Sequence, residues 1–229
     1  MTRPQYSRYD DERQMVNGVA RGLHRNLVGG MWDEIGQWQF DLMRSVGLEP
    51  GHTLLDVGCG SLRGGVRFVP YLEPGHYHGF DINRSLIDAG YEREIEPAGL
   101  AERLPRENLA VSHDFDCGVF DRRFDYALAV SVFTHLPLPV VETGLSRVAA
   151  ALARGGSFVF TYFECPQDAS FEEPILQGGG PITTFGSRNP YHQTRSSLAE
   201  IARRLDAELV DVAFRPHPRS QKPMMLTPR

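Results

Sequence analysis

The stretch Thr53-Leu-Leu-Asp-Val-Gly-Cys-Gly-Ser-Leu-Arg-Gly-Gly65 constrains the fold of this chain more than any other. Its first part, Thr53 to Val57, is a short apolar run that contains Asp56 and is typical of a buried strand. The glycines that follow permit a tight turn and let the backbone come close to a ligand. An apolar segment from Val66 predicts a helix directly afterwards. Strand, glycine turn and helix form the first half of a nucleotide-binding βαβ unit.

Composition limits the class of protein and its partners. A chain of 229 residues with 41% hydrophobic and 23% charged residues is long and apolar enough for one domain with a full core. A net charge of -5 gives no basic surface for nucleic acid or an anionic membrane, so we expect neither as a partner. Cys59, Cys117 and Cys165 are odd in number and far apart, which predicts no metal site and a reduced environment. No apolar run has the length of a signal peptide core or a membrane span, and we expect a cytoplasmic protein.

Residues 1–47 are interpreted as an N-terminal helical cap. The first 12 or so residues are polar and charged, and we expect a loose arm there. Apolar residues at helical spacing predict helices over 15–23 and 32–46, the second ended by Gly47 and Pro50. Two helices ahead of the first strand are more than a sheet needs, so they could cover whatever the glycine turn binds.

Residues 48–163 alternate between strand and helix patterns. Strands are predicted over 76–81, 108–114, 124–132 and 157–163, and helices over 85–96 and 139–152. This alternation predicts a parallel sheet with helices on both faces, a Rossmann-like doubly wound α/β fold. Gly155-Gly156 is expected to form the turn before the strand that starts at Ser157.

The rhythm breaks over residues 164–195, which are rich in proline and glycine. The segment starts at the carboxyl end of a strand, where ligands bind in open α/β sheets, so we expect a lid; a mobile surface insertion is the alternative. Residues 196–229 predict a helix over 198–205 and strands over 208–214 and 224–226. The complete prediction is one domain with a mostly parallel seven-stranded sheet and an antiparallel last strand.

Several motifs then resemble those of class I S-adenosylmethionine-dependent methyltransferases. Leu54-Leu-Asp-Val-Gly-Cys-Gly60 is similar to their first motif and Gly79-Phe-Asp-Ile82 to their acidic second motif. Later segments match in order and spacing: Ser112-His-Asp-Phe115, Phe124 to Ser131, and Leu152 to Val159. One departure is that Ser61-Leu62-Arg63 stands where the family has a third glycine; this Cys-Gly-x-Leu-Arg-Gly-Gly variant resembles bacterial enzymes that act on small molecules.

The resemblance implies a set of cofactor contacts. Asp81, at the end of the second strand, would accept the ribose hydroxyls; capping the helix near residue 85 is its alternative. Asp114 beside Phe115 would contact the adenine, with an ordinary turn aspartate as the alternative. Asp56 would accept backbone donors in the glycine turn or orient the ammonium of the methionine portion. Arg63 suits the cofactor carboxylate, or is a solvated surface arginine. Motif matches add the remaining cofactor residues: Gly58, Cys59, Gly60, Ile82 and Ser131.

Acceptor chemistry has fewer signals. His135 follows the fourth strand, near the expected position of the methyl group, and would serve either as general base or as a pocket liner. Trp32, Tyr162 and His192 are candidate acceptor contacts, although an aromatic residue at helical spacing such as Trp32 more often belongs to the core.

The sequence thus predicts an S-adenosylmethionine-dependent methyltransferase that modifies an oxygen or nitrogen of a small organic molecule, a specialised metabolite or sugar, and releases S-adenosylhomocysteine. A peptide or protein acceptor, a non-catalytic cofactor-binding protein and a nicotinamide oxidoreductase are alternatives. A homodimer, with the N-terminal helices packed on a neighbour, is also left open.

Overall fold

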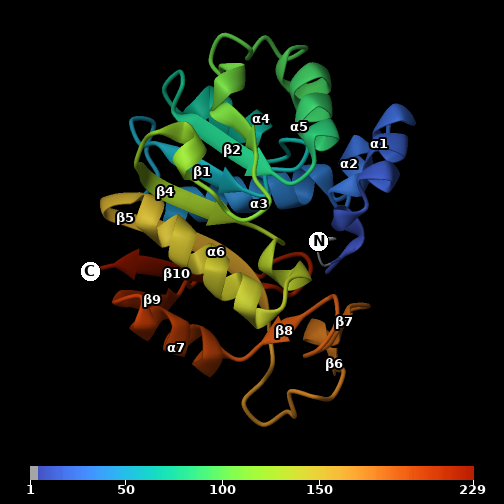
Figure 1. The fold of residues 1–229 in the computed structure, drawn as a ribbon, viewed down its shortest axis with the longest axis vertical. Coiled ribbons are helices and arrows are strands. Elements are labelled where there is room, and N and C mark those ends of the chain that lie inside the picture. Colours follow the sequence, from blue (N-terminus) through green and yellow to red (C-terminus); the bar gives the residue numbers. More distant parts are fainter. Residues whose placement is uncertain (1–4) are drawn as a thin grey trace.

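The computed structural model describes residues 5–229 and has a central sheet between two layers of helices (Figure 1). The strands lie in the order β3-β2-β1-β4-β5-β10-β9. Their bounds are β1 Leu54–Val57, β2 Tyr77–Asp81, β3 Leu109–Val111, β4 Phe124–Ala129, β5 Leu152–Glu164, β9 Ala207–Asp211 and β10 Lys222–Pro228. A short strand, β8 (His192–Gln193), pairs with β5 beside this path.

The direction of the strands confirms the predicted Rossmann-like sheet. β1 runs parallel to β2 and β4, and further parallel pairs join β2 to β3 and β4 to β5. The last strand, β10, is antiparallel to both β5 and β9. The parallel strands therefore end at one common edge, which is where the glycine turn begins.

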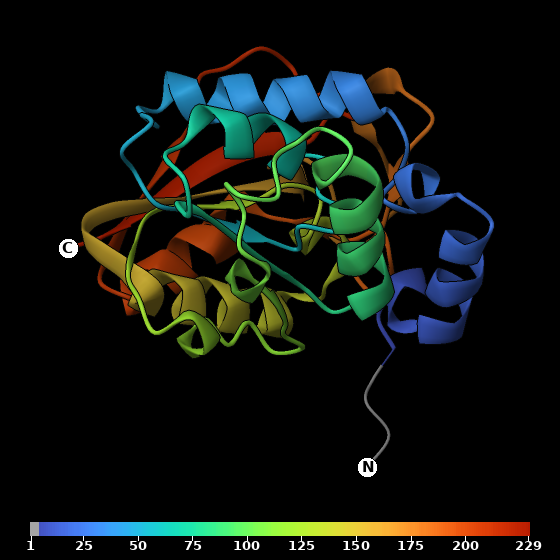
Figure 2. The same cartoon turned by 90° about the horizontal axis from the view of Figure 1, so that it is seen from above.

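Helices cover both faces of the sheet, as Figure 2 shows from above. One face carries α3 (Trp32–Ser45), α4 (Gly65–Tyr71) and α5 (Arg84–Gly90), and the other carries α6 (Leu138–Ala151) and α7 (Arg195–Arg204). Successive side chains of β1 point to opposite faces of the sheet. Leu54 belongs to the apolar cluster of Trp38 and Phe68 on the first face, whereas Leu55 belongs to that of Val141 on the second. The core is thus split by the sheet into two apolar clusters.

The N-terminal region differs from the predicted cap. The second predicted helix is α3, which packs on a face of the sheet because its buried side chains, Trp38, Leu42 and Met43, face the apolar cluster there. Only α1 (Glu12–Ala20) and the short α2 (His24–Leu27) lie to the side, against α5 (Figure 2). Of the arm expected to be loose, residues 1–4 lie outside the described residues, and the rest has defined structure ending in a 3₁₀ turn, Arg8–Asp10.

A partly buried ion pair joins this region to the turn that follows α5. The predicted helix over 85–96 changes after Gly90 into a π-helical turn, Tyr91–Ile95, which carries Glu94. Glu94 accepts hydrogen bonds from Arg25 Nε and Nη2, both at 2.7 Å, and contacts His24 Nε2 at 2.6 Å. Gly90 itself lies against the glycine turn: a Cβ atom at this position would be 2.5 Å from the Ser61 carbonyl carbon. The turn therefore rests directly on the end of α5.

The segment 164–195 is built into the sheet at one end. β6 (Ile175–Leu176) pairs with β7 (Thr183–Thr184), and β8 extends the main sheet through the Phe163–His192 pair. The lid role of this segment stays a prediction.

The expected Gly155-Gly156 turn is a bulge within β5. Phe124 of β4 pairs with Leu152, whereas Tyr126 pairs with Ser157, so residues 153–156 have no partners on β4.

In the described part of the chain, no helix is long and apolar enough to cross a membrane.

Candidate functional site

A cavity of about 490 Å³ opens at the carboxyl ends of β1, β2 and β4. Its volume is in the range of small-molecule sites, and its place is the one that open α/β sheets use for ligands. Every residue predicted for the cofactor lines it, together with the predicted base: Asp56, Gly58, Cys59, Gly60, Arg63, Asp81, Ile82, Asp114, Phe115, Ser131 and His135. The structure brings these residues together, and their individual contacts with a ligand stay predictions.

The glycine turn is held against the neighbouring strand. Gly58 and Gly60 have φ angles of +70° and +55°, which glycine adopts at no steric cost. The amides of Gly58 and Cys59 both donate to the Phe80 carbonyl, at 2.8 and 3.0 Å. A Cβ atom at position 58 would lie 2.5 Å from Val132 Cγ2. The backbone here therefore forms part of the cavity wall, and position 58 has no room for a side chain.

Ser61-Leu62-Arg63, where the family has its third glycine, is buried. Leu62 is fully buried and adopts a positive φ of 64°, which is uncommon for a residue other than glycine. Ser61 donates from its hydroxyl to the His24 carbonyl at 3.0 Å. The turn thus keeps its shape through apolar burial and a hydrogen bond to α2 in place of a glycine.

Asp81 ends β2 with its carboxylate beside the turn. Oδ2 accepts the Gly60 amide at 3.0 Å and Oδ1 accepts the Asn83 amide at 2.9 Å. Because Asn83 is the N-cap residue of α5, Asp81 also supports the start of that helix. Burial raises the pKa of Asp81, while the bonds from Asn83 and Gly60 oppose that rise. Each carboxylate oxygen can accept a further bond, so hydroxyls of a ligand can share the group.

Asp56 has two predicted roles, to accept a glycine-turn amide or to orient the ammonium of the methionine portion, and the second stays a prediction. Its Oδ2 accepts a 2.6 Å hydrogen bond from the Tyr77 hydroxyl, in place of a glycine-turn amide. Burial raises the pKa of Asp56 to about 7, although the bond from Tyr77 lowers it. The side chain still lines the cavity.

Arg63 is a buried arginine and not a solvated one, being 7% exposed. Its Nη1 donates to the carbonyls of Val28 and Gly30, at 3.0 and 3.1 Å. Nε is buried and finds no hydrogen-bond partner among residues 5–229. Burial lowers the pKa of Arg63 to about 10, so the side chain is still charged at neutral pH. Arg63 therefore lines the cavity as a cation, and its Nε–H has no partner among the described residues.

The far end of the cavity carries Asp114 and Phe115. The Asp114 side chain is 61% exposed and accepts a 2.5 Å bond from Arg147 Nη1. Phe115 has a positive φ of 61° and contacts the rings of Phe80 and Phe133. A flat apolar face next to a carboxylate is suited to a heteroaromatic ring with an amino group.

His135 lies in a 3₁₀ turn, Phe133–His135, and lines the cavity. Its Nδ1 is 2.7 Å from Asn189 Oδ1, and its ring is 5.1 Å from that of Tyr9. Burial lowers the pKa of His135, so the imidazole is neutral at physiological pH.

The three predicted acceptor contacts are not brought to the cavity. Trp32 packs edge-on against His24 and under Arg25, in the cluster that fixes α2. Tyr162 belongs to the core and donates to Glu164 Oε1 at 3.1 Å. His192 is fully buried, with both ring nitrogens occupied by Thr184 Oγ1 and the Phe171 carbonyl. These predictions followed strand and loop positions, whereas the structure uses all three side chains for packing.

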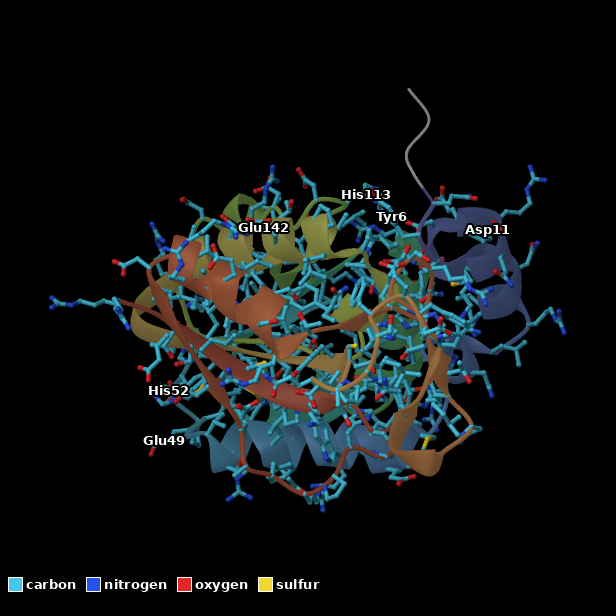
Figure 3. The ribbon with its side chains drawn as sticks, turned by 90° about the horizontal axis from the view of Figure 1, so that it is seen from below. Tyr6, Asp11, Glu49, His52, His113 and Glu142 are labelled. Carbon is cyan, nitrogen blue, oxygen red and sulfur yellow. The ribbon has the colours of Figure 1, made fainter. Side chains whose placement is uncertain are left out.

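The N-terminal arm was missed as part of the site. Tyr6, Ser7, Tyr9 and Asp10 line the cavity, and Asn83 Nδ2 donates to the Tyr9 carbonyl at 3.1 Å. Figure 3 shows Tyr6 beside His113 of the loop after β3, at the end of the molecule away from Glu49 and His52. A signal was present in the sequence, because Ser7 and Asp10 have capping-box spacing and form that box.

Comparison with known proteins finds similarity to methyltransferases. A family model described as a methyltransferase domain matches residues 55–158, from β1 into β5. Sterol 24-C-methyltransferase ERG6B of Gibberella zeae is 31% identical over 146 residues, which are 62% of this chain. The match covers 36% of that relative, so the chain spans about a third of its length.

Solved structures share the fold at low identity. Magnesium protoporphyrin IX methyltransferase (ChlM) from Synechocystis PCC 6803, with bound SAM, superposes with a TM-score of 0.58 at 11% identity, over 100% of this chain and 87% of that one. DesVI from Streptomyces venezuelae gives 0.60 at 16% identity, over 95% and 98%. The O-methyltransferase NcsB1 from neocarzinostatin biosynthesis, in complex with SAH and 1,4-dihydroxy-2-naphthoic acid, gives 0.63 at 17% identity, over 96% and 61%.

These findings define the class of the fold. The chain shares its Rossmann-like fold with solved methyltransferase structures, and its segment 55–158 is matched by the model of a methyltransferase domain. Among the described residues, no group of three or more His, Cys, Asp or Glu side chains could hold a metal ion.

Proposed function

We propose that this protein is an S-adenosylmethionine-dependent methyltransferase that modifies an oxygen or nitrogen atom of a small organic molecule, such as a specialised metabolite or sugar. One observation carries the proposal. A single cavity combines a carboxylate at the end of β2, a buried arginine with an unpartnered donor and a neutral histidine: Asp81, Arg63 and His135.

The residues of the cavity fit the parts of the methyl donor. Asp81 suits the two ribose hydroxyls, because its oxygens already face the turn and can accept more bonds. Arg63 Nε suits the donor's carboxylate. Phe115 and Asp114 suit the adenine face and its amino group. Gly58 allows the methionine portion to approach the backbone.

The protein has to position the acceptor and remove its proton. When bound, S-adenosylmethionine supplies a methyl group on a positively charged sulfur, and the electrons of the broken carbon–sulfur bond stay on that sulfur. His135 would accept the proton from the acceptor's O–H or N–H while the acceptor's electron pair forms the new bond to carbon. Solvent then takes the proton from the imidazolium, which restores the neutral histidine.

A small acceptor is favoured by the form of the site. The cavity is bounded by the arm on one side and by the sheet edge on the other, and the chain has a net charge of -5, which opposes a nucleic-acid acceptor. The neighbouring structures include enzymes described with a porphyrin and a dihydroxynaphthoic acid. For this chain the acceptor class is part of the proposal.

Calorimetric titration with S-adenosylmethionine, S-adenosylhomocysteine and NAD tests the donor site. We expect binding of the first two and none of NAD. Asp81→Ala removes the carboxylate proposed for the ribose hydroxyls and should weaken binding of both. Asp33→Ala removes an exposed partner of Arg67; as the matched control it should bind as the parent does. Binding of NAD alone would overturn the proposal. Donor binding without methylation in a screen of phenols, amines and sugars would instead favour the non-catalytic alternative.

A further inference from the structure

We propose that Asn189 is a positioning residue that holds His135 with its proton on Nδ1, leaving Nε2 as the base. The inference rests on the proposed function, since it concerns the histidine assigned there. Asn189 does not line the cavity, whereas His135 does. Its role is therefore to act through the imidazole and not on the acceptor.

The hydrogen bond itself defines the tautomer. His135 Nδ1 and Asn189 Oδ1 are 2.7 Å apart, a short distance for this type of bond. An amide oxygen only accepts hydrogen bonds, so Nδ1 must carry the hydrogen. In a neutral imidazole the second nitrogen then has a free lone pair. That nitrogen, Nε2, is the atom able to take a proton from a bound acceptor.

Asn189 is fixed by the backbone on its carboxyl side. The amide of Tyr191 donates to the Thr134 carbonyl at 2.8 Å, immediately before His135. The carbonyl of Pro190 accepts the Phe185 amide at 2.9 Å, and Phe185 and Tyr191 also form a β-bridge. The loop that holds Asn189 and the turn that holds His135 are therefore joined by one main-chain hydrogen bond as well as by the side-chain bond.

A neutral partner has an electrostatic consequence. Burial lowers the pKa of His135; the Asn189 bond raises it; and the charges of Arg8 and Arg219 lower it while that of Asp10 raises it. The remaining face is covered by the Tyr9 ring. An aspartate in place of Asn189 would stabilise the imidazolium and raise the pKa. The amide thus orients the ring and leaves it unprotonated at neutral pH.

Segment 164–195 has a specific role in this proposal, because it carries Asn189. Its predicted contact, His192, is buried away from the cavity, with both of its ring nitrogens occupied. Asn189, from the same segment, acts indirectly by orienting His135.

The test is nitrogen NMR of histidine-labelled protein, which has eight histidines. The His135 signals are assigned by their loss in His135→Gln. We expect the parent protein at neutral pH to carry the proton on Nδ1, and Asn189→Ala to lose this preference. Asn189→Asp should keep the Nδ1 proton and raise the midpoint of His135 titration by about 1–3 pH units. Arg188→Ala, which removes the neighbouring exposed side chain over Phe185, should change neither reading.

The outcomes separate this inference from the proposed function. A parent protein with its proton on Nε2, or an Asn189→Ala variant with unchanged tautomer and titration, overturns the role of Asn189. Circular dichroism and thermal unfolding check that each variant is folded, and we expect the same melting temperature in all of them. Because the NMR measurement needs neither donor nor acceptor, absence of donor binding would remove the proposed function alone.

Discussion

The two sides of the cavity are built in different ways. The glycine-turn side, defined by Gly58, Gly60 and Asp81, comes from the ends of two adjacent parallel strands, whose spacing the sheet fixes. The arm side, defined by Tyr9 and His135 with Asn189 behind them, joins the N-terminus, the turn after β4 and a loop 54 residues beyond that turn. One side is made of two strands that pair in the sheet, with Gly60 and Asp81 21 residues apart, and the other of segments that are more widely separated in the chain.

We expect the two sides to contribute differently to donor binding, stability and turnover. Side chains on the glycine-turn side are held by main-chain hydrogen bonds of the sheet edge, so changes there should affect donor binding and stability. The arm side is held by hydrogen bonds to the main-chain carbonyls of Tyr9 and Thr134, and the side chains of Tyr9 and Asn189 add contacts to His135. Changes to these side chains should therefore affect turnover more than the fold. The following predictions, from the largest effect to the smallest, test this separation.

His135→Ala should have the largest effect. Loss of a general base is expected to lower turnover about 100-fold or more, while the donor's affinity stays nearly unchanged. Turnover and calorimetric titration are measured on the same preparation. His52→Ala is the matched control, because His52 lies at the other end of the molecule (Figure 3). A parallel loss of donor affinity would make His135 a pocket liner and break the comparison.

Asp81→Ala should weaken donor binding by about 1.5–3 kcal/mol, the cost of removing charge-assisted hydrogen bonds. The Gly60 and Asn83 amides also lose their acceptor, so we expect a lower melting temperature as well. Titration calorimetry and thermal unfolding give the two values. Unchanged affinity would remove Asp81 from the ribose role. An unchanged melting temperature would show that the turn does not depend on this carboxylate.

His217 lies near Arg63 of the glycine-turn side and should make the stability of the protein depend on pH. Burial and the nearby charges of Arg63 and Arg219 lower the pKa of His217 to about 3. The unfolded chain therefore binds a proton below pH 6.5 that the folded protein does not, and stability falls as the pH drops. Between pH 7 and 5 this loss is up to about 2 kcal/mol, and His217→Gln should remove it. Denaturant unfolding at both pH values checks this, and an equal acid loss in the variant would contradict it.

Tyr9→Ala should have the smallest effect of the four. It removes the ring contact with His135 but keeps the backbone carbonyl that Asn83 binds. Aromatic contacts contribute about 0.5–1.5 kcal/mol, so we expect turnover to fall about 2- to 10-fold. Tyr9→Phe retains the ring and should behave as the parent does. A loss of global stability in Tyr9→Ala would show that the arm side also supports the fold.

The sequence predicted best what neighbouring residues determine. The strand through Val57, the turn at Gly58 and the acidic end of β2 at Asp81 are local patterns, and the register of β1 and β2 brings them together. Hydrophobic periodicity likewise predicted α6 to within one residue at each end.

Long-range convergence was less predictable. Nothing in the local sequence around Tyr9 or Asn189 indicates that both will meet His135. Tyr162 was predicted as an acceptor contact from its place at a strand end and His192 from its place late in the expected lid, but both side chains are buried in the fold. The π-helical turn after Gly90 also has no distinct pattern, because its apolar spacing continues that of α5.

The close contact between Gly90 and Ser61 has an evolutionary consequence. A glycine turn without its third glycine has to rest on something, and here it rests on a helix position that only glycine can occupy. The atoms that a Cβ at position 90 would meet are main-chain atoms of Ser61, so the requirement is set by the path of the turn and not by its side chains. Across related chains that keep this path, position 90 should therefore stay glycine whichever residue stands at position 61.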